Sequence, residues 1–142
     1  MKTVQQLLQV KGSAVHAVAP EATVLDSIKI MAEHGVGALV VVSENRVAGI
    51  LSERDYARKV ILHGRSSQDT AVREIMTAKV VTVRPEQTVE ECMALMTDKR
   101  IRHLPVVDGG ALVGIVSIGD LVREVIADRE ETIKQLESYI HQ

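Results

Sequence analysis

Aromatic side chains are almost missing from this chain of 142 residues, which has two Tyr and neither Phe nor Trp. Its formal net charge is −2 and its pI is about 6.2, so basic side chains are not in excess either. Proteins that bind nucleic acid use a basic surface and aromatic platforms on which bases stack. The composition therefore argues against a nucleic-acid partner, and any base bound here must rest on aliphatic side chains.

Cysteine and long hydrophobic runs are equally scarce. Cys92 is the only cysteine, which excludes a disulfide within the chain, and the apolar spacing around it predicts the buried face of a helix. No run of about 18 apolar residues occurs, and the first residues lack the charged-then-apolar pattern of a secretory signal. We expect no contact with a membrane and a cytosolic location.

Catalytic and metal-binding motifs are also missing. No cluster of His, Cys, Asp or Glu has the spacing of metal ligands, no Gly-x-x-x-x-Gly-Lys phosphate loop occurs, and Gly109-Gly110 is typical of a hairpin turn. We therefore expect neither catalysis nor a bound metal ion.

What the chain does contain is an internal duplication. Shifted by 65 positions, the sequence matches itself without a gap. The matching pairs include Pro20 with Pro85, Thr23 with Thr88, Gly49 with Gly114, Ser52 with Ser117 and Asp55 with Asp120. The paired residues are of two kinds: apolar residues that a repeated fold needs for its core, and a repeated Ser-x-x-Asp that suggests a duplicated site.

Each copy predicts the same order of elements. A helix begins at Thr23 or Thr88, two short apolar strands follow it across a polar turn, and a second helix begins at each Ser-x-x-Asp. The expected strands are 38–42 and 47–51 in the first copy and 104–107 and 112–116 in the second, and the expected second helices are 53–62 and 118 onward. Because one unit alone leaves its sheet uncovered, we expect an α/β fold whose two units pack through their sheets.

The polar stretch 64–70 predicts the connection between the copies, so we divide the chain into residues 1–70 and 71–142. The last segment, 121–142, keeps apolar residues at helical spacing beyond what the second copy needs. Such an overhanging amphipathic helix packs on its own domain or on a second copy more often than on a foreign partner, and we expect self-association.

These motifs, in one order and at one offset, resemble the CBS-domain pair, also called the Bateman module. The motifs are Val72-Arg-Glu-Ile-Met-Thr77 before the second copy, Pro-x-x-Thr-Val at each first helix, Arg102-His-Leu-Pro-Val-Val107 at a strand, and Gly-Ile-[Leu/Val]-Ser-x-x-Asp at each second helix. The resemblance covers nearly the whole chain and is to the small stand-alone members. It implies two tandem CBS motifs, each β-α-β-β-α, related by a pseudo-two-fold axis.

The resemblance also implies a function. Such modules regulate rather than catalyse, commonly bind AMP, ADP, ATP, NAD(H) or S-adenosylmethionine between the motifs, and often form a homodimer. We expect a sensor in which AMP, ADP, ATP or NAD(H) bridges the halves and stabilises one orientation that a regulated protein reads, with S-adenosylmethionine the less favoured ligand. The alternative is a protein-interaction or dimerisation module with the same fold and no nucleotide.

Ser52 with Asp55, and Ser117 with Asp120, stand where a strand gives way to a helix. One interpretation is a capping box that satisfies the first N–H groups of the helix and contributes about 1 kcal/mol. The other is a ligand site, because a helix N-terminus suits a phosphate and a neighbouring carboxylate can accept both hydroxyls of a ribose. The resemblance implies that Asp55 and Asp120 take the ribose, with Ser52 and Ser117 near the ribose or phosphate. The two roles are compatible.

The copies differ at one strand entrance. Arg100, Arg102 and His103 stand where the first copy has Gly35, Gly37 and Ala38. The basic or titratable side chains suit phosphates, as does Arg54, although Arg100 by itself is more typical of a solvated turn. Gly37 and Ala38 leave space for a base or a nicotinamide-sized group.

The adenine pocket is expected to be aliphatic. It should use backbone hydrogen bonds from the segments around His16 and from Val81 to Val83, with Leu104 and Pro105 nearby. A Pro within a strand removes a donor of the sheet, which suits a position next to a cleft.

Overall fold

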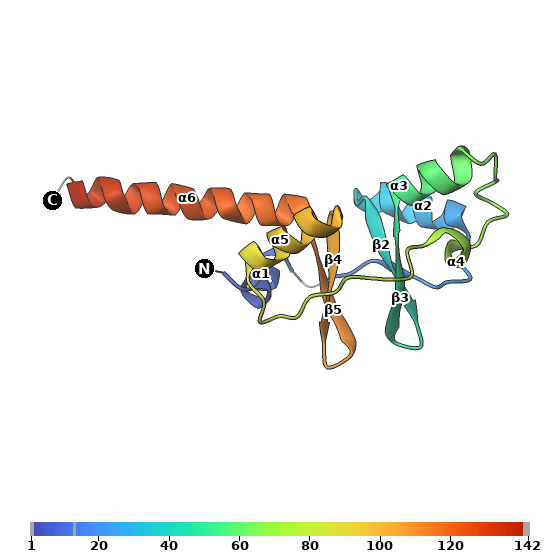
Figure 1. Cartoon of the computed structure of the whole chain (residues 1–142), viewed down its shortest axis with the longest axis horizontal. Helices are drawn as coiled ribbons and strands as arrows, with labels where there is room; N and C mark the ends of the chain where they lie inside the picture. Colours follow the sequence, from blue (N-terminus) through green and yellow to red (C-terminus); the bar gives the residue numbers. More distant parts are fainter. Residues whose placement is uncertain (1, 13, 141–142) are drawn as a thin grey trace.

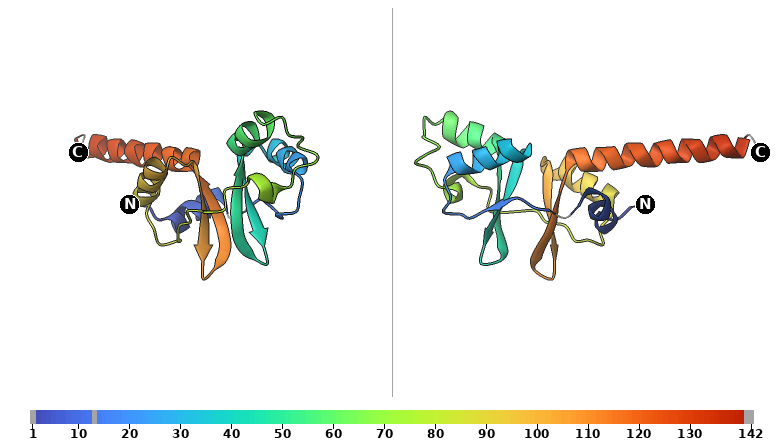
Figure 2. Two further views of the ribbon diagram at one scale, coloured as in Figure 1. Left: turned by 45° about the vertical axis from the view of Figure 1, so that its right-hand side comes forward. Right: turned by 180° about the vertical axis from the view of Figure 1, so that it is seen from behind.

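The protein consists of two halves that stand side by side, seen in a computed structural model that describes residues 2–12 and 14–140 (Figure 1). Each half has a small sheet with helices on its outer side. The two sheets face one another in the middle, where β3 (Arg46–Ser52) contacts β5 (Ala111–Ser117). The views in Figure 2 show the same layering. The predicted α/β fold, with two repeated units packed through their sheets, is confirmed.

The repeats give the two halves the same order of elements. The first half contains β1 (Ala17–Val18), α2 (Val24–His34), β2 (Ala38–Ser43), β3, α3 (Glu53–Tyr56) and a π-helical turn, η1 (Ala57–Ile61). The second contains α5 (Val89–Lys99), β4 (His103–Asp108), β5 and α6 (Ile118–Ile140). The hairpins β2–β3 and β4–β5 are antiparallel. β1 lies parallel to β2, and a single parallel bridge between Val83 and Val106 marks the same place in the second half.

Both hairpins turn through two residues with positive φ. Glu44 and Asn45 have φ values of 52° and 65°, and Gly109 and Gly110 have 59° and 83°. A two-residue turn of this kind matches the right-handed twist of paired strands, and Asn and Gly adopt it at little cost. It sets a register in which the first residue of each hairpin pairs with the serine of Ser-x-x-Asp.

The helix that precedes each repeat packs on the opposite half. α1 (Val4–Lys11) contributes apolar side chains to the core of the second half, whereas Val72 and Ile75 of α4 (Val72–Ile75) belong to the core of the first. Each packing unit therefore combines one repeat with the leading helix of the other. The division into residues 1–70 and 71–142 that we made from the sequence assigns α1 and α4 to the halves on which they do not pack.

Two glycines allow the leading segments to approach the strands. A Cβ on Gly49 would lie 2.6 Å from Sδ of Met76 and 2.9 Å from the carbonyl oxygen of Thr77. A Cβ on Gly114 would lie 2.8 Å from Cδ1 of Leu8. An added methyl would press on backbone as well as side chain at Gly49 of β3, and on the Leu8 side chain alone at the equivalent Gly114 of β5.

The second helix of the first half differs from the α-helix predicted over 53–62. It is α-helical through α3 and then π-helical in η1, where the N–H of Leu62 donates to the carbonyl of Ala57 at 3.2 Å. Turns of π-helix are rare and occur frequently at functional sites. This one follows directly on the first Ser-x-x-Asp.

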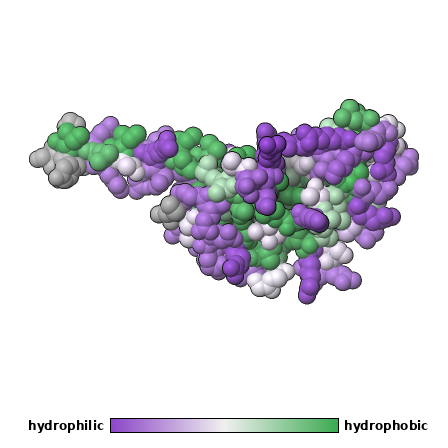
Figure 3. Space-filling view, in the orientation of Figure 1, coloured by the Kyte–Doolittle hydropathy of each residue, from purple (hydrophilic) through white to green (hydrophobic). Residues whose placement is uncertain are grey.

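The helix α6 has 23 residues and leaves the body of the protein after its first turns (Figure 1). Leu121 is buried in the core of the second half, whereas Ile126, Ile133, Leu136 and Ile140 are 52% to 75% exposed. Figure 3 shows apolar surface along the projecting helix. The last two residues of the predicted segment 121–142 lie outside the described residues.

Candidate functional site

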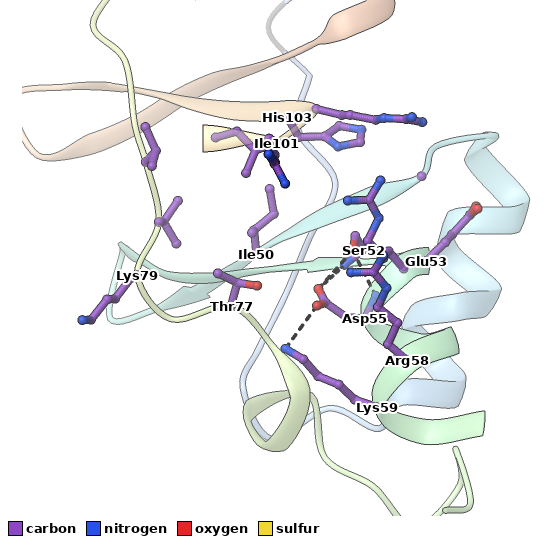
Figure 4. Close-up of a pocket in the computed structure, with 16 residues that line it drawn as sticks. Ile50, Ser52, Glu53, Asp55, Arg58, Lys59, Thr77, Lys79, Ile101 and His103 are labelled. Atoms are coloured by element: carbon purple, nitrogen blue, oxygen red, sulfur yellow. Dashed lines mark hydrogen bonds and ion pairs between the residues drawn. The ribbon is translucent and has the colours of Figure 1, made fainter. Parts of the chain in front are cut away.

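A pocket of about 590 Å³ lies between the two halves. It is lined by the junction of β3 with α3, by the start of β4 with the residues before it, and by the segment 77–81. Figure 4 shows Ser52 and Asp55 on one side of it and Ile101 and His103 on the other. Eight predicted site residues line this pocket: Gly37, Ser52, Arg54, Asp55, Val81, Arg100, Arg102 and His103.

Asp55 stands at the β3–α3 junction, where 9% of the residue is exposed. Its Oδ2 accepts hydrogen bonds from the N–H and Oγ of Ser52 at 3.0 and 3.1 Å, and its own N–H donates to that Oγ at 3.2 Å. Its Oδ1 lies 3.2 Å from Nζ of Lys59, which donates at 2.8 Å to the carbonyl of Ile75. The capping box is present, and Oδ1 carries only this longer ion-pair contact among the contacts of the described residues.

The N-terminus of α3 offers fewer backbone donors than the sequence predicts. The N–H of Glu53 donates to the carbonyl of Gly37 at 3.1 Å, and the N–H of Asp55 donates to Ser52. An anion in this pocket must therefore be held mainly by side chains.

Cationic side chains from both halves meet at the pocket. Six Lys or Arg residues and two carboxylates line it. The cations are Arg54, Arg58 and Lys59 from the first half, Arg100 and Arg102 from the second, and Lys79 from the segment between them. Arg58, Lys59 and Lys79 were not among the site residues predicted from the sequence. The first two lie three and four residues after Asp55 on the same helical segment, and that spacing could have indicated them.

Arg100 reaches the pocket from a strained backbone position. It ends α5 in the left-handed conformation, with φ 56° and ψ 45°, where its counterpart Gly35 ends α2 with φ 64°. Left-handed backbone costs a residue with a Cβ roughly 1–2 kcal/mol. In spite of this cost, the second half has a guanidinium group at the position where the first half has a glycine.

His103 is largely withdrawn from solvent beside the pocket. Burial lowers the pKa of the imidazole, and the charges of Lys11 and Arg102 lower it further, while Asp120 and Glu53 act in the opposite direction. The balance favours the neutral ring, so His103 can bind a phosphate as a hydrogen-bond donor rather than as a fixed charge.

Three residues expected at an adenine pocket do not line this one. Leu104, Pro105 and Val83 are buried in the second half. The backbone of Val83 is also fully used, because its N–H donates to Pro105 at 3.0 Å and its carbonyl accepts from Val107 at 2.9 Å. From this part of the chain, Val81 reaches the pocket instead.

Ala38 and His16 do not line the pocket either. Ala38 is 6% exposed within β2, and the ring of His16 stacks on that of His34 with 3.7 Å between the centroids. Of the two residues expected to leave space, Gly37 is at the pocket.

Ser117 and Asp120 repeat the capping geometry but do not line this pocket. Oδ2 of Asp120 accepts from the N–H of Ser117 at 2.8 Å and from Nζ of Lys11 at 2.6 Å, and Oδ1 accepts from Arg123 at 2.7 Å. Burial opposes ionisation of this carboxyl, but the bonds from Lys11 and Ser117 outweigh it and lower its pKa. Both oxygens are bound by groups of the chain itself.

Cys92 is a buried structural residue, as predicted. It is 0% exposed in the core of the second half, and burial, followed by the charge of Glu91, raises its pKa to about 11. Within residues 2–12 and 14–140, no three His, Cys, Asp or Glu side chains stand close enough to hold a metal ion. No helix in the same ranges is long and apolar enough to cross a membrane.

Known proteins match this arrangement. A family model for the CBS domain matches residues 10–62 and 72–127, which are the two repeats. The chain belongs to the CBS-domain family. The mitochondrial CBS-domain protein CBSX3 of Arabidopsis thaliana is 44% identical over 97% of this chain and 71% of its own. A CBS-domain protein from Burkholderia ambifaria superposes with a TM-score of 0.86 at 57% identity, covering 89% of this chain and 96% of that one.

Two further CBS structures concern ligands and assembly. One CBS domain pair was solved in complex with 5′-methylthioadenosine and S-adenosyl-L-methionine (25% identity, TM-score 0.81, 90% and 98% of the chains). A CBS-CP12 protein from bloom-forming cyanobacteria is hexameric (29% identity, TM-score 0.76, 93% and 85% of the chains). The prediction of a stand-alone CBS-domain pair is confirmed, and such pairs are generally regulatory modules.

Proposed function

We propose that this CBS-domain pair is a regulatory sensor that binds an adenine nucleotide in the pocket between its halves. One observation carries the proposal: a carboxylate at the end of β3 faces cationic side chains that belong to the other half. A ligand that contacts both would hold the halves in one relative orientation. The adenosine-containing ligands of the related CBS pair support the nucleoside part.

Each part of a nucleotide has a counterpart in the pocket. Asp55, with Oδ1 turned from the capping bonds, accepts the ribose hydroxyls, and Ser52 lies beside it. The base rests on aliphatic side chains, for which Ile50, Val81 and Ile101 are available. A volume of about 590 Å³ is within the usual range for small-molecule sites.

The charge of the pocket favours phosphates. Six cations against two carboxylates leave an excess of positive charge in a chain whose net charge is −2. This excess favours ATP or ADP over AMP and NAD(H), which carry fewer negative charges. It disfavours S-adenosylmethionine most, because its sulfonium and amino groups are cationic.

Binding becomes a signal when the ligand prefers one orientation of the halves. Because the cations come from both halves and repel one another, an anion between them draws the halves together. The regulated protein and the cytosolic location stay predictions from the sequence.

Thermal unfolding of nucleotide-stripped protein with AMP, ADP, ATP, NAD⁺, NADH and S-adenosylmethionine tests the proposal. A ligand at about 100 times its Kd adds roughly 2.7 kcal/mol, which is a shift of several degrees for a domain of this size. We expect the largest shift with ATP and its loss in Asp55→Ala.

The capping role of Asp55 calls for a matched control. Glu74 accepts the N–H of Ala71 at 2.8 Å, which is the carboxylate half of a capping box at the start of α4, and does not line the pocket. Asp55→Ala and Glu74→Ala should both lower the melting temperature, but only the first should lose the ligand shift. No shift with any compound at millimolar concentration would favour the module that acts by protein contacts alone.

The exposed residues of α6 support self-association. Ile126, Ile133 and Ile140 recur every seven residues with Leu136 between them, the spacing of a coiled-coil seam. On our proposal, two chains pair along α6. Ile133→Glu should turn a dimer into a monomer in sedimentation equilibrium, whereas Lys134→Glu, one residue further along α6, should not. A dimer that survives Ile133→Glu would assign the interface to another surface.

A further inference from the structure

The second Ser-x-x-Asp is occupied by a side chain of the same molecule. Nζ of Lys11 lies 2.6 Å from Oδ2 of Asp120 and donates at 2.5 Å to the carbonyl of Ile115, the strand residue two before Ser117. With Arg123 on Oδ1, the carboxylate has a charged donor on each oxygen. An ammonium and a guanidinium thus stand where the hydroxyls of a ribose would have to donate.

The first site lacks this arrangement. Its leading helix, α4, has four residues and ends at Ile75, whereas α1 has eight residues and ends at Lys11. The chain beyond α4 is extended, and Lys79 lines the pocket without an ion pair among the described residues. Asp55 lines the pocket with one ion-pair contact, from Lys59 at 3.2 Å, whereas Asp120 holds Lys11 at 2.6 Å and Arg123 at 2.7 Å and does not line it.

Lys11 is held in place by the exchange of leading helices. Val4, Leu7 and Leu8 of α1 lie in the core of the second half, and Leu8 packs against Gly114 in β5. The ammonium at the end of this helix is delivered to Asp120 by buried packing, and the carboxylate is only 6% exposed. Lys11 is only part-buried, with 30% of its side chain exposed, so the cost of separating the pair falls on the carboxylate, which would lose a counter-charge away from water.

We propose that Lys11 closes the Asp120 site to ligand, so that each chain binds a single nucleotide in the Asp55 pocket. This inference rests on the proposed function. Lys11 thereby determines the number of ligands per chain, which sequence duplication alone predicts to be two. On this proposal the second half binds no ligand at Asp120 and only contributes Arg100 and Arg102 to the Asp55 pocket.

Isothermal titration with ATP measures this number. The unaltered protein should bind one ATP per chain. Lys11→Met, which keeps the apolar stem and removes the charge, should bind two, and Lys11→Arg, which keeps the charge, should bind one. Circular dichroism shows whether each variant is folded. A count of one in folded Lys11→Met would overturn the inference.

Amide spectra of the unaltered protein provide a test that needs no variant. Arg54 and Gly119 occupy the same position in the two repeats. Saturating ATP should shift the amide signal of Arg54 and leave that of Gly119 in place. Two ATP per chain, with both amides shifted, would overturn the inference and leave the proposed function intact. No binding by any form of the protein would remove the proposed function, and the inference with it.

Discussion

Single residues of the pocket hold positions that are unfavourable for folding. Arg100 adopts a left-handed conformation at the position where the first repeat has Gly35, and His103 is half-buried among charged side chains. Residues kept in such positions are over-represented at functional sites, because the surrounding fold compensates for their cost. We therefore expect Arg100 and His103 to lower the stability of the fold while they serve ligand binding.

Arg100→Gly should stabilise the protein and weaken ATP binding. Glycine relieves the left-handed backbone, partly offset by the larger entropy of the unfolded chain, so we expect a gain of up to about 1 kcal/mol. The pocket meanwhile loses one of its cations. Urea denaturation and ATP titration measure the two effects. Gly35→Ala, at the equivalent position, should lose stability. A loss of stability in Arg100→Gly would contradict the claim that the backbone of Arg100 is strained.

His103 should make the protein less stable in mild acid. The folded pKa lies below the ordinary value of 6.5, because burial, Lys11 and Arg102 outweigh Asp120 and Glu53. The unfolded chain then binds the proton more readily, so the stabilisation is complete above pH 6.5 and is lost as the pH falls below it. Melting temperatures from pH 8 to pH 5 should drop more steeply in the unaltered protein than in His103→Gln. Equal slopes would show that this imidazole is not the responsible group.

At the scale of elements, the contact between β3 and the segment after α4 shapes the pocket. Ile50 and Thr77 exchange backbone hydrogen bonds of 3.0 and 2.9 Å, and both residues line the pocket. Gly49 makes the contact possible, because it leaves room for Met76. One wall of the pocket is therefore formed by the backbone pairing of Ile50 with Thr77, which depends on a glycine at position 49.

Gly49→Ala should destabilise the protein by about 1–3 kcal/mol, the usual cost of overpacking. The added methyl would meet the carbonyl oxygen of Thr77 at 2.9 Å, and backbone cannot move aside as a side chain can. Gly114→Ala should cost less, because it meets only the end of Leu8. Urea denaturation compares the two, and ATP affinity should fall only in Gly49→Ala. An equal cost would mean that the segment after α4 is easily displaced.

At the scale of the whole molecule, the two halves are interlocked. The core of the second half contains Val4, Leu7 and Leu8 from the start of the chain, and the core of the first contains Val72 and Ile75 from beyond the connection. Residues 1–70 lack α4, which completes the core of the first half, and carry α1, whose packing partners lie in residues 71–142. The reverse holds for residues 71–142. The halves are thus parts of one cooperative unit.

Fragments 1–70 and 71–142 should therefore not fold separately. Each exposes a core that the other fragment completes, so we expect poorly dispersed amide spectra from each alone and a native-like spectrum after mixing. A cooperative melt of either isolated fragment would contradict the interlocking. The fragment 14–142, which lacks α1, should also be destabilised, because the second core loses three apolar side chains.

The order of elements and part of the pocket could be predicted from the sequence, because they depend on local patterns. Apolar runs between turns located the four long strands to within one or two residues, and hydroxyl caps located the helix starts at Thr23 and Thr88. The Ser-x-x-Asp pairs are capping boxes for the same local reason. Family motifs added Arg102 and His103, which do reach the pocket.

By itself the sequence determined the duplication, the fold class and the capping carboxylates, because each of these is encoded in spacing along the chain. Only the tertiary structure decided that the leading helices exchange halves, since packing partners distant in sequence leave no local pattern. That exchange places Lys11 on Asp120 and lets Lys79 line the pocket of Asp55. Two motifs that are equal in sequence therefore become unequal sites, because Lys11 reaches Asp120 from a distant part of the chain, whereas Asp55 is contacted by Lys59, four residues further along.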